Sequence, residues 1–152
     1  MIAISRAAWD AMVAHARAVY PNECCGAMVG STDGETKRVL EAVPIENTFE
    51  GVQRERYEIA PESLLAADRE ARARGLELIG IFHSHPDCDA YFSTTDLKNS
   101  CPWYSFVVLS VRQGEVVAAK SFLPDLDQTR ADEEELTYGE DSDTHTASAV
   151  RG

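Results

Sequence analysis

Residues 76–96 have the sequence LELIGIFHSHPDCDAYFSTTD, and the chain changes character sharply inside this stretch. The first seven residues form a mostly apolar run of strand length, which is typical of a buried β-strand. From His83 to Phe92 the sequence is polar and predicts an irregular segment. This stretch therefore predicts a buried strand that runs directly into histidine, aspartate and serine residues.

Two segments upstream of this strand predict helices. In residues 61–75, Pro61 suits the first helical position and Gly75 suits the position just past the end. Residues 5–20 carry apolar side chains at helical spacing, and Ser5 can serve as their N-cap. Both helices have one apolar face that needs a partner surface.

Further strands are predicted from apolar and alternating patterns. They cover residues 24–30, 36–45, 56–59, 105–111 and 115–122, and a short helix is expected within 93–99. Apolar strands that alternate with helices favour an α/β architecture in which helices cover a sheet.

The composition is that of one globular domain. The chain has 152 residues, 44% of them hydrophobic, and its formal net charge is −12. No nucleic-acid partner is expected, because phosphate contacts need clustered Lys and Arg. No apolar stretch is long enough for a transmembrane helix, so no membrane partner is expected either. The first residues lack a signal-peptide pattern and the cysteines lack that of a disulfide scaffold, which together favour a cytoplasmic location.

The acidic residues are concentrated near the C-terminus. Residues 125–152 contain nine acidic and two basic side chains, with Ser, Thr and Gly between them. Such a composition is typical of disorder. We therefore expect a folded domain over residues 1–124 and an acidic, mostly disordered tail over residues 125–152.

The histidines after the buried strand predict a metal site. Alternate residues of a strand point to the same face, so His83 and His85 can direct both imidazoles at one point. Asp96 follows eleven residues after His85, which is enough chain to return and supply a carboxylate. Two histidines, a carboxylate and one open position match a catalytic zinc site, in which water takes the fourth place.

Two further side chains suit hydrolysis at such a site. Glu23 stands just before the strand predicted at 24–30, and it would reach a zinc-bound water if that strand lies beside the one ending at His83. Glu23 could then act as the general base. Ser93 could donate a hydrogen bond to the oxyanion that forms on an attacked carbonyl.

Each of these residues also has a purely structural interpretation. Residues 93–96 match a helix capping box, in which Ser93 caps and Asp96 reaches back. The two histidines could be polar residues at a strand end, and Glu23 could be a solvated acid beside a turn. The presence of all five residues together favours the metal site over these alternatives.

The pattern His83-x-His85-Pro86, followed by Ser93-x-x-Asp96, resembles the JAMM motif of the MPN+ metalloproteases. Residues 21–26, PNECCG, resemble the segment that supplies the glutamate of that family. The resemblance covers residues 1–123 and is to the compact bacterial branch, which includes hydrolases of sulfur-carrier proteins. It implies a cytidine-deaminase-like JAB/MPN fold, with a central mixed β-sheet flanked by helices.

The resemblance also implies an activity, a zinc-dependent metallo-(iso)peptidase with one Zn²⁺ per chain. By position, His83, His85 and Asp96 correspond to the zinc ligands, Glu23 to the general base and Ser93 to the oxyanion stabiliser. The bond cleaved would follow the C-terminal Gly-Gly of a ubiquitin-like or sulfur-carrier protein, for example with release of cysteine.

The motif is also compatible with other functions. A non-catalytic MPN scaffold and a metallopeptidase acting on other peptides are the alternatives, and the resemblance also allows a homodimer. Small bacterial members often have a further histidine near the position of Cys88. We expect Cys88 to be a loop residue near the zinc, and the alternatives are a competing soft ligand and an oxidation-sensitive switch.

Overall fold

The computed structural model describes residues 1–140 of the chain. Its elements are β1 (Ile2–Ser5), α1 (Arg6–Val19), β2 (Cys25–Asp33), β3 (Thr36–Ile45), α2 (Pro61–Ala73), β4 (Glu77–Pro86), α3 (Thr94–Lys98), β5 (Ser105–Arg112), β6 (Glu115–Pro124), β7 (Ala131–Glu134) and β8 (Leu136–Glu140). No helix within this part of the chain is long and apolar enough to cross a membrane.

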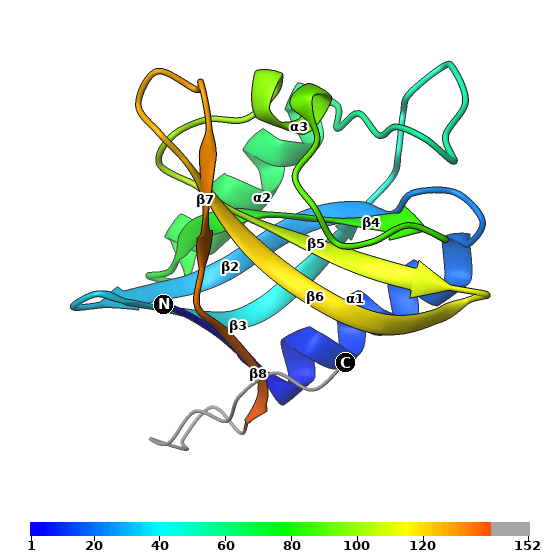
Figure 1. Ribbon diagram of the computed structural model, residues 1–152. Coiled ribbons are helices and arrows are strands. Elements are labelled where there is room, and N and C mark those ends of the chain that lie inside the picture. Colours follow the sequence, from blue (N-terminus) through cyan, green and yellow to red (C-terminus); the bar gives the residue numbers. More distant parts are fainter. Residues whose placement is uncertain (141–152) are drawn as a thin grey trace.

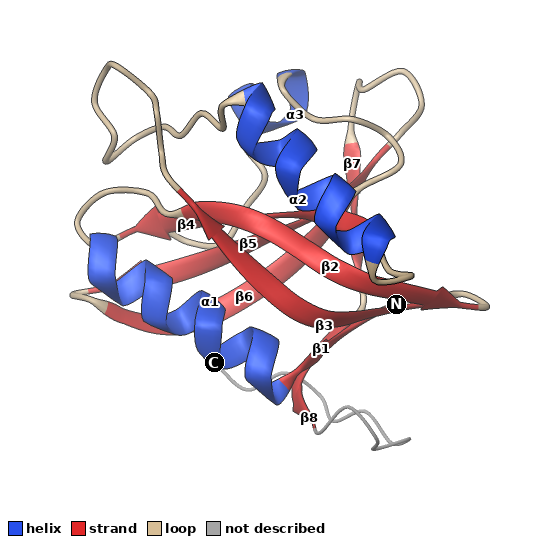
Figure 2. Ribbon diagram, turned by 180° about the vertical axis from the view of Figure 1, so that it is seen from behind, coloured by secondary structure: helices blue, strands red, loops and turns tan. Residues whose placement is uncertain are grey.

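The strands of the described residues form one sheet in the order β7-β6-β5-β4-β2-β3-β1-β8. Strand β4 runs parallel to β5 and antiparallel to β2, so the sheet is mixed. Helix α1 covers one face, and α2 and α3 lie on the other (Figure 1, Figure 2). The predicted α/β architecture, a central mixed sheet flanked by helices, is confirmed.

Of the apolar clusters in the described residues, the two largest attach α1 and α2 to opposite faces of the sheet. The larger cluster lies under α1, and its members include Ile2, Ile4, Met12, Met28, Phe82 and Leu109. The smaller cluster lies under α2 and contains Ala27, Val29, Ile45, Ala67, Ala71 and Leu78. Because side chains alternate along β4, Phe82 packs toward α1 while its neighbours Ile81 and His83 face the side of α2 and α3.

The helix boundaries follow the sequence signals. The Ser5 hydroxyl accepts a hydrogen bond of 3.2 Å from the backbone N–H of Ala8, which caps α1. Helix α2 starts at Pro61, and Gly75 follows its end with a φ of +73°. Glycine adopts this left-handed conformation without steric cost. Both helices begin and end within two residues of the predicted bounds.

The strand predictions need three corrections. Residues 56–59 form no strand, because the carbonyl of Arg56 and the N–H of Glu58 bond to the side chain of Asn47 rather than to a neighbouring strand. Strand β4 continues past the histidines to Pro86, where β5 still pairs with it, so this part of the segment is not irregular. The four-residue β1 is too short to show a period and is not predicted at all.

The predicted domain boundary at residue 124 also differs from the structure. Strand β7 pairs with β6, and β8 pairs in parallel with β1, so the sheet extends well into the segment expected to be disordered. The acidic composition wrongly predicts disorder here, because Glu134 is buried and accepts hydrogen bonds from Ser105 and Ser121. The expected disorder is therefore wrong for β7 and β8, and residues 141–152 lie outside the described residues.

Gly80 marks a very close approach of β4 to β5. A Cβ atom at this position would lie 1.9 Å from the backbone carbonyl oxygen of Ser105, which cannot rotate away. We expect Gly80→Ala to lower the free energy of unfolding in urea by about 3 kcal/mol, because the two strands must separate to accommodate the methyl group. Gly51→Ala is the control, since the nearest atoms to its Cβ would belong to the side-chain ring of Phe49 rather than to the backbone. A Gly80→Ala protein as stable as the parent would contradict this packing.

Candidate metal centre

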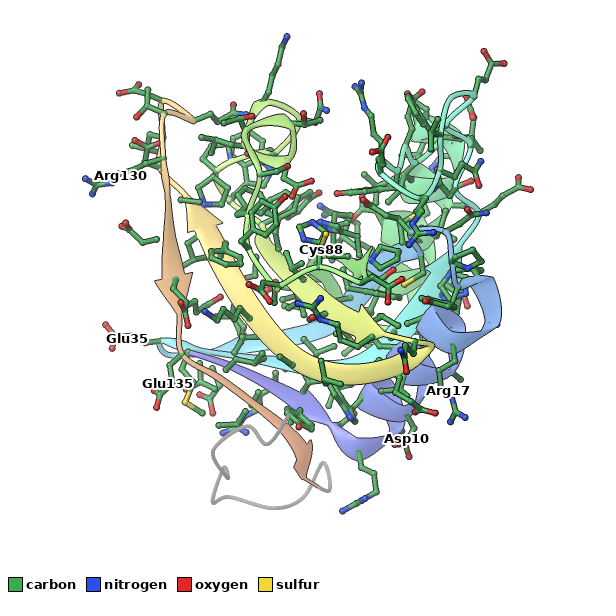
Figure 3. The ribbon with its side chains drawn as sticks, turned by 45° about the vertical axis from the view of Figure 1, so that its right-hand side comes forward. Asp10, Arg17, Glu35, Cys88, Arg130 and Glu135 are labelled. Carbon is green, nitrogen blue, oxygen red and sulfur yellow. The ribbon has the colours of Figure 1, made fainter. Side chains whose placement is uncertain are left out.

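A cavity of about 810 Å³ opens on the face of the sheet that carries α3. Its wall includes residues 54–59 from the loop between β3 and α2, the segment that follows β4, and α3 itself. Cys88, labelled in Figure 3, lies on this wall just past the end of β4. The size of the cavity is that of a site for a small molecule or a peptide segment.

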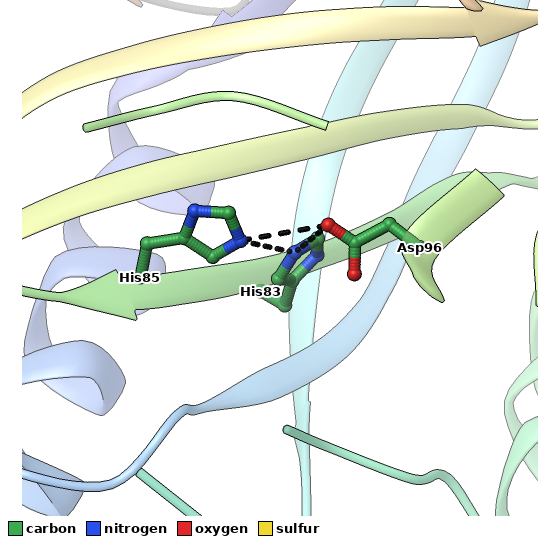
Figure 4. A group of neighbouring side chains, drawn as sticks. All are labelled: His83, His85 and Asp96. Atoms are coloured by element: carbon green, nitrogen blue, oxygen red, sulfur yellow. Dashed lines mark hydrogen bonds and ion pairs between the residues drawn. The ribbon is translucent and has the colours of Figure 1, made fainter. Parts of the chain in front are cut away.

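Three metal-ligand side chains converge at this cavity (Figure 4). His83 and His85 extend from β4, and Asp96 extends from α3. The Nε2 atoms of the two histidines are 3.3 Å apart. Asp96 Oδ2 lies 3.3 Å from Nε2 of His83 and 3.5 Å from Nε2 of His85. The fold thus brings the three residues predicted as ligands to one point.

The spacing of these atoms fits a tetrahedral zinc ion. Zinc bonds of about 2.0–2.1 Å at tetrahedral angles separate two ligand atoms by about 3.3–3.4 Å, close to all three observed separations. Nδ1 of His85 lies 3.0 Å from the carbonyl oxygen of Asp89. Because a carbonyl only accepts, Nδ1 carries the hydrogen and Nε2 directs a lone pair at the cluster, as a ligand must.

Burial favours the ligand form of His83. His83 is fully buried and His85 is 6% exposed. Burial lowers the pKa of His83, and the hydrogen bond and charge of Asp96 oppose this effect only in part. The neutral imidazole, which is the form that binds metals, is therefore favoured.

Glu23 is placed by the strand pairing on which its expected role depends. Strands β2 and β4 lie side by side with Cys25 opposite His83, so the expected neighbourhood of the two strands is confirmed. Within the preceding segment, the Cys24 N–H donates a hydrogen bond of 2.7 Å to the hydroxyl of Ser84. Ser84 stands between the two histidines, and it therefore ties the segment that carries Glu23 directly to the metal-ligand strand.

The carboxyl group of Glu23 is buried in the same cavity. The residue is 6% exposed, and it lines the cavity together with His85, Ser93 and Asp96. Burial raises the pKa of Glu23 to about 8, and the negative charge of Asp96 adds to this rise. A carboxyl group with a pKa near neutrality can both take up and release a proton, as a general base and acid must.

The capping box predicted at residues 93–96 forms beside the ligand cluster. The hydroxyl of Ser93 accepts from the Asp96 N–H at 3.0 Å, and Asp96 Oδ2 accepts from the Ser93 N–H at 3.0 Å. The same Oδ2 atom faces both histidines. A carboxylate oxygen has more than one lone pair, so capping and metal binding by Asp96 are compatible.

Two residues of the loop between β3 and α2 are part of the site but have no signal in the sequence. The ring of Tyr57 stacks on the imidazole of His83, with centroids 4.6 Å apart. The side chain of Asn47 donates to the carbonyl of Glu23 at 3.2 Å. Tyr57 lies in the stretch predicted as a strand and Asn47 in no predicted element, and neither belongs to a spaced motif, so only the folded chain reveals that they adjoin the cluster.

Cys88 lies outside the ligand cluster. Among the described residues, the group of ligand atoms within 4.8 Å of one another comprises His83, His85 and Asp96. Cys88 is exposed, and its backbone carbonyl accepts a hydrogen bond from Ser110. The structure therefore places it as a loop residue on the cavity wall.

The fold and the ligand set together define a JAB/MPN-type domain, and comparison with known proteins identifies the family. Residues 5–122 match the model described as prokaryotic homologs of the JAB domain, so the chain belongs to this family. It is 31% identical over 114 residues to a desampylase of Haloferax volcanii, an alignment that covers 72% of this chain and 80% of that protein. A desampylase of Pyrococcus furiosus is 33% identical over 96 residues, covering 63% of this chain and 64% of the relative.

Two solved structures and one phage protein complete the comparison. A protein from Desulfitobacterium hafniense has 32% identity and a TM-score of 0.81, over 95% of this chain and 97% of that one. A JAB1/MPN domain protein from Archaeoglobus fulgidus, with 16% identity and a TM-score of 0.54 over 90% and 98% of the two chains, shows the shared fold. Tail tip assembly protein K of Escherichia phage N15 is 33% identical over 100 residues, which cover 62% of this chain but only 36% of the phage protein.

Proposed function

We propose that this chain, a JAB-type hydrolase by its family and its desampylase relatives, is a zinc-dependent metallo-(iso)peptidase. Its substrate would be the bond that follows the C-terminal Gly-Gly of a ubiquitin-like or sulfur-carrier protein. The observation that carries the proposal is the meeting of His83, His85 and Asp96 at one point, with Glu23 buried in the same cavity.

The ligand residues, Glu23 and Ser93 would have separate roles in hydrolysis. His83, His85 and Asp96 would hold a zinc ion, which would supply Lewis-acid polarisation of the scissile carbonyl and would lower the pKa of water. Glu23 accepts a proton from the attacking water and passes it to the leaving amine, so the C–N bond breaks and a C–O bond replaces it. The Ser93 hydroxyl accepts from the Asp96 N–H with a lone pair, which leaves its own hydrogen to donate to the oxyanion.

The size and position of the cavity suit the end of a polypeptide chain. The cavity of about 810 Å³ reaches from the loop that carries Tyr57 to α3, and two of the ligands, His85 and Asp96, line it. A Gly-Gly segment has no side chains, so it can approach a buried cluster more closely than other dipeptides can. Two relatives with the name desampylase support a ubiquitin-like substrate over an arbitrary peptide.

The alternatives differ in what they require of the chain. A non-catalytic scaffold does not need a complete ligand set, and this chain has all three ligands and a buried carboxylate beside them. A peptidase of another purpose needs the same ligand set, and the phage relative, which is named for tail tip assembly, shows that similar chains do not all carry the name desampylase. The experiment that tests the proposed substrate also separates these two alternatives.

The test uses the full chain loaded with zinc and a sulfur-carrier protein whose Gly-Gly end is extended by cysteine. Intact mass spectrometry should record loss of that cysteine, and removal of the metal by a chelator should abolish the cleavage. A second reaction offers a Gly-Gly end joined to a lysine side chain. Cleavage of neither substrate by a protein that holds zinc would reject the proposed specificity, and a protein without affinity for zinc would revive the scaffold.

A further inference from the structure

His83 differs from His85 in how its ring is held. Nδ1 of His85 donates to the carbonyl of Asp89, and this hydrogen bond fixes both the tautomer and the plane of that ring. Nδ1 of His83 is buried, and no atom of the described residues forms a hydrogen bond with it. Since ligand histidines usually depend on such an outer contact, something other than a hydrogen bond within this part of the chain must orient His83.

The ring of Tyr57 is in the right place to orient His83. The two rings are stacked, with centroids 4.6 Å apart and planes inclined by 27°. A face-on contact of this kind restricts rotation of the imidazole about its Cβ–Cγ bond, because rotation would drive the ring into its neighbour. The aromatic neighbour of His85 is Tyr91, and it meets that ring at 64°, edge to face.

The loop that carries Tyr57 is held by specific hydrogen bonds. The Asn47 amide donates to the carbonyls of Glu23 and Arg56, and its oxygen accepts from the N–H groups of Phe49 and Glu58. All the donors and both lone-pair directions of this amide are used, so the two ends of the loop are joined beside Tyr57.

A second set of contacts fixes the loop from the other side. The Glu23 N–H donates to the carbonyl of Gln53 at 2.8 Å. Arg54 forms an ion pair of 3.0 Å with Asp87, which follows β4 directly and also accepts from the hydroxyl of Tyr20. The loop is therefore tied both to the segment that carries Glu23 and to the end of the strand that carries the histidines.

We propose that Tyr57 is a positioning residue whose ring face holds the His83 imidazole in the plane that directs Nε2 at the metal. This inference rests on the metal site of the proposed function and adds a residue that the JAMM pattern does not contain. It makes the loop between β3 and α2 part of the metal centre, and it assigns the work to the face of the ring rather than to the hydroxyl group.

The test compares the zinc affinity of the full-length parent with that of two variants at this position. Tyr57→Leu removes the ring, and we expect it to weaken zinc binding by about 10-fold or more in competition with a chromophoric chelator, as loss of an outer contact does at other metal sites. Tyr57→Phe keeps the ring and should bind zinc within about 3-fold of the parent. Tyr104→Leu is the matched control, because Tyr104 lines the same cavity and packs against the cluster under α2.

The outcomes separate this proposal from the proposed function. A parent protein that binds no zinc would reject the metal site itself. If the parent binds zinc and the Tyr57→Leu variant is folded and binds zinc with the same affinity, only the role of Tyr57 would be rejected. If Tyr57→Phe and Tyr57→Leu weakened zinc binding equally, the hydroxyl group would be the part that positions His83, and the proposal would be overturned.

A measurement on the parent keeps the proposal testable if Tyr57→Leu does not fold. In the zinc-loaded protein, nuclear Overhauser contacts should connect the ring protons of Tyr57 with those of His83. Stacking should also shift the His83 ring protons upfield of those of His85. Absence of these contacts would show that the rings separate when the metal binds, and the proposal would fail.

Discussion

Glu23→Gln should leave zinc bound and reduce cleavage after Gly-Gly by on the order of 10²–10⁴-fold, the usual contribution of a general base. The amide is nearly the same size as the carboxyl group, and the backbone of Glu23 is held through Gln53 and Asn47, so the cavity should keep its shape. An amide, however, cannot take a proton from water. The rate constant at saturating substrate and the zinc content of the same preparation are the two quantities to measure.

A neighbouring carboxylate provides the control for this substitution. Glu55 lines the same cavity but is exposed, and the structure gives it no place beside the ligand cluster. Glu55→Gln makes the same chemical change in an exposed side chain and should change the rate by less than about 3-fold, the effect expected of a screened surface charge. If Glu23→Gln and Glu55→Gln were equally active, the proton transfer would have to be reassigned to another group.

Asp96→Ala should remove zinc binding and weaken α3 at the same time. Loss of an outer contact at a metal site costs about 10–100-fold in affinity, so loss of a ligand should exceed about 100-fold. The carboxylate also accepts the Ser93 N–H, and loss of such a cap lowers the free energy of unfolding by about 1 kcal/mol. Chelator competition measures the first effect, and urea unfolding of the metal-free protein measures the second.

Two milder substitutions separate these roles. Asp96→Asn keeps an oxygen that can accept the Ser93 N–H, so the metal-free protein should stay nearly as stable while zinc affinity falls. Ser93→Ala removes the cap from the other side and should lower stability by about 1 kcal/mol with zinc still bound. Asp96 would be only a capping residue if Asp96→Ala retained zinc as tightly as the parent.

The sequence predicted the ligand cluster because the position of each ligand follows from local patterns of the chain. His83 and His85 share one face through the alternation of a strand, and Asp96 follows a serine that begins a helix. Glu23 required one long-range assumption, that its strand lies beside the strand of the histidines, and the pairing of Cys25 with His83 bears it out. Helix α2 could also be predicted from the sequence, since Pro61 and Gly75 mark its two ends.

The features that the sequence did not predict depend on contacts between distant segments. Tyr57 lies in a stretch that resembles a strand, and the side chain of Asn47 diverts this stretch from sheet pairing. The acidic composition around Glu134 predicts solvation, but Ser105 and Ser121 supply donors to its buried carboxylate. Composition alone does not show where such donors will be found in the folded chain.

The pairing of β1 with β8 has a consequence for the order in which the chain folds. Strand β1 lies between β3 and β8, although β8 is the last strand of the described residues. During synthesis, β1 is therefore an edge strand with unpaired backbone groups until the residues of β8 have left the ribosome. Folding that waits for such distant pairings is slow, and an open edge in the meantime can pair with another nascent copy.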